Sequence, residues 1–194
     1  MVAHDKRRRE ILEHALDIFI TEGYEDVTFQ KIADRCGITR TTLYIYFKNK
    51  KEMFNYSIKQ LMGDVEADIV RIRQDKGLNT RDKLGKVLLV IIDRLEENCR
   101  LLSVILDYLH YLSKKDAAPD TLVRRRTIRL RHILATMIIE GIRAGEIRPV
   151  NVRIADDLLY GLIESAIFRL AVLKRSSVEE MKLAAALMVQ QLGS

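Results

Sequence analysis

The chain is poor in the residues that break helices and in those that build disulfide frameworks. Of its 194 residues, two are Pro and two are Cys, while 48% are hydrophobic. Two cysteines as far apart in sequence as Cys36 and Cys99 exclude a disulfide scaffold. The scarcity of Pro and the long apolar patterns with a 3.6-residue period predict an all-α protein that can bury a core in one large or two modest domains.

No segment is apolar for long enough to cross a bilayer. The longest purely aliphatic run extends from Val87 to Ile92, whereas a spanning helix needs about 18 residues. The N-terminus, MVAHDKRRRE, is charged and has no apolar signal core. We therefore expect a cytoplasmic protein with no membrane partner.

Motifs that carry catalysis or bind metals are also missing. The sequence has no glycine-rich phosphate loop, no nucleophile elbow and no repeated Cys pair. Its four histidines form no i,i+4 pair with one another and no Glu-x-x-His motif: His4, His14, His110 and His132. We expect no enzyme, no cofactor and no metal site.

The charge balance says little about partners. The formal net charge is +6, and residues 1–62 hold 11 basic and 9 acidic side chains, so the excess is not concentrated there. Lys6-Arg7-Arg8-Arg9 can lie along a phosphate backbone or form a solvated arm. Arg124-Arg125-Arg126 with Arg129 and Arg131 spreads around one expected helix, which favours a solvated face over an anion or nucleic-acid site.

One stretch, from Thr28 to Lys50, has the pattern of two short helices joined by a tight turn. Thr28 and Thr39 can each accept a hydrogen bond from a free N–H at a helix start. Gly37 offers the left-handed backbone conformation at which the first helix can end and the chain turn within about 3–4 residues. This spacing is typical of a helix-turn-helix.

The second short helix offers one cation and three hydroxyls: Arg40, Thr41, Thr42 and Tyr44. Leu43 and Phe47, one turn apart, can hold the helix on the body of the protein. Arginine can make two parallel hydrogen bonds to guanine, and hydroxyls can reach bases or phosphates. The exposed side of this helix therefore suits DNA.

At these residues the sequence resembles the DNA-binding signature of the TetR family of transcriptional regulators. The matching positions keep one register: Thr28, Ile32-Ala33, Gly37-Ile38-Thr39, Thr42-Leu43-Tyr44, Tyr46-Phe47 and Asn49-Lys50. The segment from Ala144 to Pro149 also resembles the family at the turn before its last two helices.

The resemblance implies a homodimer that binds double-stranded operator DNA and responds to a small apolar or amphipathic effector. It implies that four side chains lie near bases: Gln30, Arg40, Thr41 and Tyr44. It implies that five others hold phosphates: Thr28, Thr39, Thr42, Tyr46 and Lys50. Thr41 stands where many relatives have glycine or another small residue, which leaves the base read there open, and Cys36 stands where alanine is common.

The rest of the pattern predicts a three-helix head followed by a helical bundle. A first helix over residues 8–21 should end at Gly23. A long helix over residues 50–74 should start at the capping-box pair Asn49 and Glu52. Further helices are expected at residues 80–98, 101–112, 120 or 121 to 144, 153–173 and 178–192, the last with a capping box from Ser177 to Glu180. We expect a helix-turn-helix domain at residues 1–50, an effector-binding and dimerisation domain at residues 51–194, and a shared connector at residues 50–74.

The last two expected helices are apolar on more than one face. Such helices at the end of a small domain need a second partner surface, and pairing with their copies gives a four-helix dimer interface, which the resemblance also implies. The residues expected there are Leu158, Leu162, Ala166, Leu170, Ala184, Leu187 and Met188. The alternative is that both are core helices of a single copy.

An effector site in a helical bundle is lined by apolar and aromatic groups with a few polar atoms. The candidates are Cys99, Tyr108, Tyr111, Tyr160 and Phe168. Each of these side chains could equally be core packing.

The sequence as a whole predicts a ligand-responsive, DNA-binding transcriptional regulator that acts as a repressor. Two alternatives stay open. A helical enzyme or cargo-binding bundle would explain the C-terminal part but not the stretch from Thr28 to Lys50. A DNA-binding structural protein without an effector would explain that stretch but not the large aromatic-bearing body.

Overall fold

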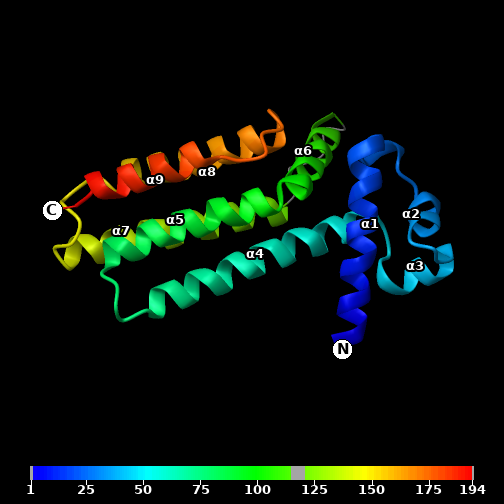
Figure 1. The fold of residues 1–194 in the computed structure, drawn as a ribbon, viewed down its shortest axis with the longest axis horizontal. Coiled ribbons are helices and arrows are strands. Elements are labelled where there is room, and N and C mark those ends of the chain that lie inside the picture. Colours follow the sequence, from blue (N-terminus) through cyan, green and yellow to red (C-terminus); the bar gives the residue numbers. More distant parts are fainter. Residues whose placement is uncertain (1, 115–120, 194) are drawn as a thin grey trace. The chain divides into compact units, whose positions relative to one another are not determined.

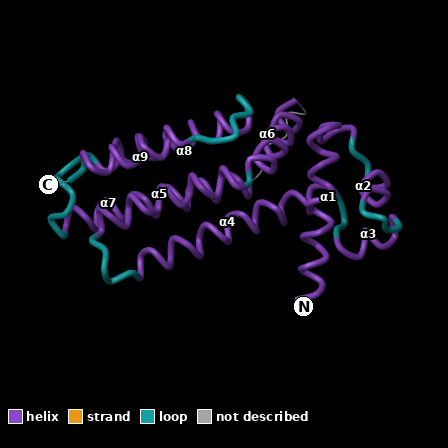
Figure 2. Tube along the Cα trace, in the orientation of Figure 1, coloured by secondary structure: helices purple, strands orange, loops and turns teal. Residues whose placement is uncertain are grey.

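The computed structural model describes residues 2–114 and 121–193, and in these residues the chain is all-α (Figures 1 and 2). The described residues form nine helices: α1 (Val2–Asp26), α2 (Phe29–Arg35), α3 (Arg40–Tyr46), α4 (Lys50–Gln74), α5 (Thr80–Glu97), α6 (Cys99–Lys114), α7 (Thr121–Arg143), α8 (Val152–Ala171) and α9 (Glu179–Gln191). An isolated antiparallel bridge joins Ile147 and Gly193. The predicted fold class is confirmed. None of the described helices is long and apolar enough to cross a membrane.

The first helix is longer than the sequence predicted. α1 begins at Val2, so the predicted start at residue 8 was wrong. The added turns contain neither Pro nor Gly, and Arg7 pairs with Glu10 one turn further on at 2.7 Å. Gly23 interrupts the helix with φ 78° and ψ 164°, which confirms the predicted break.

The chain divides into two compact units. The first comprises residues 1–60 and 100–121, and the second comprises residues 61–99 and 122–194. The boundary falls inside α4, so this helix contributes to both units. α6 belongs to the same unit as α1, α2 and α3 although it follows them by more than 50 residues in the chain. The division of the chain into DNA-binding and effector-binding domains concerns function and stays a prediction.

The core of the first unit is built around aromatic rings. Tyr24 lies 4.9 Å from Phe54 and 4.7 Å from Tyr108, measured between ring centroids. Phe19 lies 5.0 Å from Phe54 in an edge-on arrangement. Aromatic pairs at these separations contribute about 0.5–1.5 kcal/mol beyond the area they bury. The rings therefore bind α1, α4 and α6 into one body.

The core of the second unit is aliphatic. α5 contacts both α8 and α9, and α8 contacts α9, as Figure 1 shows. The predicted apolar stripe of α5 is buried, which confirms it: Leu84, Val87, Leu88, Ile91, Ile92 and Leu95. Ion pairs tie other helices to α5: Arg94 binds the buried Asp68 of α4 at 2.7 Å, and Lys182 of α9 binds Glu96 at 2.7 Å.

Candidate nucleic-acid interface

The turn between α2 and α3 forms as the sequence predicts. The Thr28 hydroxyl accepts a hydrogen bond from the Lys31 N–H (3.2 Å), and the Thr39 hydroxyl accepts one from the Thr42 N–H (3.1 Å). Gly37 has φ 63°, a left-handed conformation that suits glycine. These contacts confirm two helix caps and the predicted turn.

α3 has one buried side and one exposed side. Leu43 is fully buried and Phe47 is 1% exposed, so the helix is held on the first unit as predicted. On the other side Arg40, Thr41 and Tyr44 are exposed, and we call these three residues the α3 outer face. The Arg40 Nη2 donates to the Tyr44 hydroxyl (3.2 Å), and its guanidinium lies 5.7 Å from the Tyr44 ring centroid.

Tyr44 is itself supported from α2. Its ring lies 5.1 Å from that of Phe29, a buried residue at the start of α2. Phe29 thus orients Tyr44, and Tyr44 in turn orients Arg40. The bond to Tyr44 uses one of the five N–H donors of the guanidinium, so the planar group keeps donors for a second acceptor. The α3 outer face is therefore partly preorganised for hydrogen bonding.

The other side chains expected near DNA are spread around this face. Gln30 is exposed and donates to Asp34 (2.7 Å), and the hydroxyls of Thr39 and Thr42 lie 2.8 Å apart. The Tyr46 ring packs 4.9 Å from that of His4 on α1. Their contacts with nucleic acid stay predictions.

Lys50 has an internal role that the sequence did not indicate. Its Nζ donates to the carbonyl oxygens of Tyr24 (2.6 Å) and Glu25 (3.2 Å), and it lies 4.6 Å from the Tyr24 ring centroid. Burial of the ammonium group lowers the pKa of Lys50. The side chain thus ties the start of α4 to the end of α1, and an ammonium group has a third N–H that can reach a phosphate.

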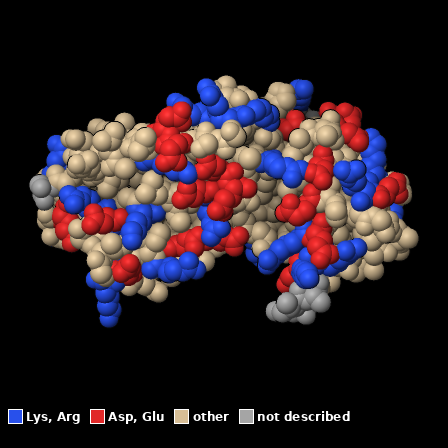
Figure 3. All heavy atoms as spheres, viewed as in Figure 1, with Lys and Arg blue, Asp and Glu red and all other residues tan. Residues whose placement is uncertain are grey.

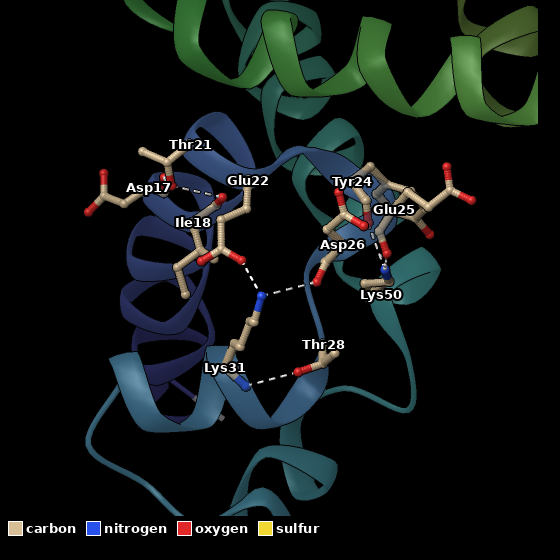
Figure 4. A network of polar contacts seen from close by, with 10 residues as sticks. All are labelled: Asp17, Ile18, Thr21, Glu22, Tyr24, Glu25, Asp26, Thr28, Lys31 and Lys50. Atoms are coloured by element: carbon tan, nitrogen blue, oxygen red, sulfur yellow. Dashed lines mark hydrogen bonds and ion pairs between the residues drawn. The ribbon is translucent and has the colours of Figure 1, made fainter.

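A second lysine holds the same connection from α2. Lys31 forms an ion pair with Glu22 and donates to the carbonyl oxygen of Asp26 (3.4 Å). Figure 4 shows Lys31 and Lys50 reaching the end of α1 from two different helices. The segment before Thr28, and with it the start of α2, is therefore fixed by charged side chains.

Both backbone polar groups of Tyr24 are hydrogen-bonded to side chains. Its carbonyl accepts from Lys50, and its N–H donates to Asp107 Oδ2 of α6 (2.7 Å). Burial raises the pKa of the Tyr24 hydroxyl. The sequence carries a weak signal for this arrangement: Gly23 ends the regular helix, and a freed N–H then needs an acceptor.

The five residues expected to line an effector site are divided between the two units, with Tyr108 and Tyr111 in the first and Cys99, Tyr160 and Phe168 in the second. Tyr108 is 1% exposed in the aromatic core of the first unit, and Tyr111 lies 5.2 Å from Tyr24 there. Cys99, half-buried, begins α6. Tyr160 donates to the Thr127 hydroxyl (3.3 Å) in the second unit, and Phe168 is 52% exposed on α8. Effector contacts at these positions stay predictions.

The residues expected at the dimer interface fall into two groups. Ala166 and Leu170 are buried within one copy, and Leu162, Ala184 and Met188 are half-buried. Leu158 is 54% exposed and Leu187 is 60% exposed. Four further apolar side chains are exposed, although the sequence did not predict them at this interface: Ile154, Phe168, Val172 and Leu183.

These exposed residues follow the helical period. Positions 154, 158 and 168 of α8 and position 172 at its C-cap, with Gly161 and Ser165 between them, repeat every three or four residues and so share one side of the helix. Leu183 and Leu187 lie one turn apart on α9. We call Ile154, Leu158, Phe168, Val172, Leu183 and Leu187 the α8–α9 apolar stripe. Exposed apolar side chains that repeat along one side of a helix are typical of a protein–protein interface.

The arginine cluster of α7 is largely used in ion pairs. Arg126 binds Glu66 (2.6 Å), and Arg131 binds the buried Asp156 (2.7 Å). On the face drawn in Figure 3, basic and acidic side chains are intermixed. Among the described residues, no group of three or more His, Cys, Asp or Glu side chains is arranged to hold a metal ion.

Comparisons with known proteins agree with this geometry. Residues 11–56 match the family model of bacterial regulatory proteins, tetR family. The fatty acid metabolism regulator protein of Bacillus subtilis (strain 168) is 26% identical over 166 residues, which cover 81% of this chain and 80% of that protein. The biofilm operon icaADBC HTH-type negative transcriptional regulator IcaR of Staphylococcus aureus (strain Newman) is 30% identical over 88 residues, 45% of this chain and 47% of its own length.

The likeness extends to solved structures over nearly the whole chain. The transcriptional regulator FadR from Bacillus subtilis, in complex with stearoyl-CoA, superposes with a TM-score of 0.71 at 23% identity. The superposition covers 96% of this chain and 97% of that one. The two chains therefore share one fold from the helix-turn-helix through the C-terminal bundle.

Proposed function

Because the chain belongs to the TetR family of bacterial transcriptional regulators, we propose that it represses its target genes as a homodimer bound to a pseudo-palindromic operator. Its relatives are DNA-binding regulators rather than enzymes. The observation that carries the proposal is the α3 outer face, where Arg40 and Tyr44 form a supported, exposed pair while Leu43 and Phe47 anchor the helix.

In this proposal α3 enters the major groove. Arg40 pairs with a guanine edge through two parallel N–H groups, and Thr41, Tyr44 and Gln30 lie near neighbouring bases. Phosphate oxygens are bound by the hydroxyls of Thr28, Thr39, Thr42 and Tyr46 and by the ammonium group of Lys50. Phosphate contacts fix the register of the protein on the duplex, and base contacts select the sequence.

The partner that covers the α8–α9 apolar stripe is a second copy of the chain. A twofold axis places the same stripe on both partners, so the two stripes cover each other in a four-helix interface. The two α3 helices then read half-sites whose centres lie about 34–36 Å apart, or a multiple of that distance. Ala166 and Leu170 support the interface from within each copy.

The proposed effector is an amphipathic molecule of the long-chain acyl-CoA class. Both Bacillus subtilis matches support this class: the curated relative is named for fatty acid metabolism, and the solved FadR structure contains stearoyl-CoA. α4 runs through both units, so an effector that prefers one position of this helix changes DNA binding. A coupling of about 1–3 kcal/mol is enough for release.

Selection of bound DNA from a random pool tests two parts of the proposal together, DNA binding by α3 and the formation of the homodimer. We expect enrichment of an inverted repeat with half-sites about one helical turn apart. Addition of stearoyl-CoA should then release the selected fragment, while free CoA should not. A pool that shows no enriched sequence contradicts the proposed function, and an enriched single half-site contradicts the homodimer.

A further inference from the structure

The four cations near the N-terminus do not share one environment. Lys6 and Arg9 are exposed, and Arg7 pairs with Glu10. The Arg8 side chain is only 20% exposed and is turned toward the interior of the first unit. The basic run Lys6-Arg7-Arg8-Arg9 therefore contains one arginine, Arg8, whose side chain faces inward.

Arg8 covers the residue that ends α3. Its guanidinium carbon lies 4.8 Å from the ring centroid of Phe47 and 4.4 Å from that of Tyr56 on α4. The Phe47 N–H donates to the Leu43 carbonyl (3.0 Å) and so closes the last turn of α3. Cation–π contacts gain strength when the partners are shielded from water, as Phe47 is at 1% exposure.

Arg8 also reaches the turn between α3 and α4 through Glu52. Its Nη2 donates to Glu52 Oε1 (3.2 Å), while Glu52 Oε2 accepts from the Lys48 N–H (2.7 Å). The Glu52 N–H in turn donates to Asn49 Oδ1 (2.8 Å). One carboxylate therefore connects α1 to the backbone that leaves α3.

The two contacts act on a short element. α3 has seven residues, too few to be stable by its own hydrogen bonds, so its direction depends on what holds its ends. The N-terminal end is capped by Thr39, and the C-terminal end is covered by Arg8 and tied to the chain after it by Glu52.

We infer that Arg8 is a positioning residue for DNA binding, which with Glu52 fixes the direction of α3 and makes no phosphate contact of its own. The inference rests on the proposed function, because it concerns the helix that we place in the major groove. It assigns opposite roles to two adjacent arginines, since Arg9 is exposed and free to act through its charge.

Full-length variants compared on the selected operator over a series of salt concentrations test this assignment. Arg8→Gln should weaken operator binding about tenfold, in protein that circular dichroism shows to be fully folded. The salt slope, which is the slope of the logarithm of the binding constant against the logarithm of the salt concentration, should equal that of the wild type. Arg9→Gln removes the same charge one residue away and is the matched control. A lost phosphate contact reduces the slope by about 0.9, so a reduced slope for Arg8→Gln overturns the inference.

Substitution of Glu52 separates a charge effect from a positioning effect, because the two predict opposite changes in operator affinity. Loss of an acid near DNA strengthens binding if only charge matters, whereas loss of the contact between α1 and the turn weakens it. We expect Glu52→Ala to weaken operator binding several-fold and Glu13→Ala, at an exposed acid of α1, to leave it unchanged or stronger. Tighter binding by Glu52→Ala overturns the inference.

Arg8→Lys keeps the charge but loses the planar stacking group, and it decides the question if Arg8→Gln does not fold. Weakened operator binding by the folded Arg8→Lys variant supports the inference, and wild-type affinity overturns it. Wild-type protein that selects no sequence contradicts the proposed function itself. If the wild-type protein binds its operator and the Arg8→Gln variant binds it with equal affinity, only the role of Arg8 is contradicted.

Discussion

The α3 outer face and the α8–α9 apolar stripe are both exposed in a single copy, but they differ in chemistry. The first consists of a guanidinium and two hydroxyl-bearing side chains, and the second consists of aliphatic and aromatic side chains. A polar face keeps its hydrogen bonds in water and can exchange them for bonds to DNA at little net change, which suits reversible binding. An apolar stripe is costly to hydrate and favours lasting burial.

The two surfaces also differ in how they are supported. α3 has seven residues and depends on Thr39, Arg8 and the anchors Leu43 and Phe47 for its direction. α8 has 20 residues, and its inner side is packed over its whole length. Small changes around α3 should therefore alter DNA binding, whereas only a large change on α8 should alter assembly.

The largest expected effect comes from placing charge on the apolar stripe. The double variant Leu158→Glu with Phe168→Glu puts four carboxylates into a twofold interface, two from each copy. We expect a monomer by light scattering and a loss of operator affinity of at least about 100-fold, because two heads no longer bind together.

Val70 supplies the control for this variant. It is 53% exposed on α4 and lies outside the stripe, so Val70→Glu should leave the molar mass and the operator affinity as in the wild type. A double variant that stays dimeric would contradict the proposed interface and leave the exposed stripe to another partner.

Arg40→Ala addresses the polar face and should have the next largest effect. We expect a loss of about 1–3 kcal/mol in operator binding and relaxed selection at one base position in each half-site. The dimer should persist, because α3 does not belong to the stripe. Tyr44→Phe is the sharper companion: it removes the hydroxyl that accepts from Arg40 and keeps the ring, so it should cost less. Unchanged selectivity in Arg40→Ala would exclude a base contact by this residue.

Lys50→Met separates the internal and the external role of one ammonium group. The loss of bonds to the Tyr24 and Glu25 carbonyls should lower the free energy of unfolding by about 1 kcal/mol, since the group is half-buried. The loss of a phosphate contact should reduce the salt slope of DNA binding by about 0.9. Reduced stability with an unchanged slope would leave Lys50 with its internal role alone.

Local patterns were enough to predict most of the fold and the turn before α3. Gly37, the caps at Thr28 and Thr39, and the pairing of Asn49 with the Glu52 N–H all depend on residues a few positions apart. Besides the start of α1, a second local prediction was wrong: Ser177 does not cap α9. The helix follows Val178 with no side-chain cap bond, and the Val178 N–H donates to Glu96 of α5 (2.9 Å).

Contacts between distant residues could not be predicted. Arg8 meets Glu52 across 44 residues, and Tyr24 meets Asp107 across 83. Tyr108 has aliphatic and aromatic neighbours in the sequence, a pattern shared by ligand pockets and protein cores, so the sequence does not indicate its burial in the core of the first unit. The residue spacing within α6 does not indicate that this helix packs on Tyr24, because this contact depends on the tertiary fold.

The smallest expected effect concerns the ion pair that holds α9, and with it Leu183 and Leu187, on α5. Bonds from Lys182 first, and then from Ser177, lower the pKa of Glu96 from 4.5 to about 2. A carboxyl group whose pKa is lowered by folding stabilises the protein above its unfolded pKa, and this contribution is lost as the pH falls through about 2. Urea unfolding should show Glu96→Gln to be less stable than wild type by about 0.5–1 kcal/mol, equally at pH 7 and pH 5 and progressively less below pH 4. A difference that persists unchanged in acid would mean that packing, and not the charge of Glu96, holds α9 and its part of the apolar stripe in place.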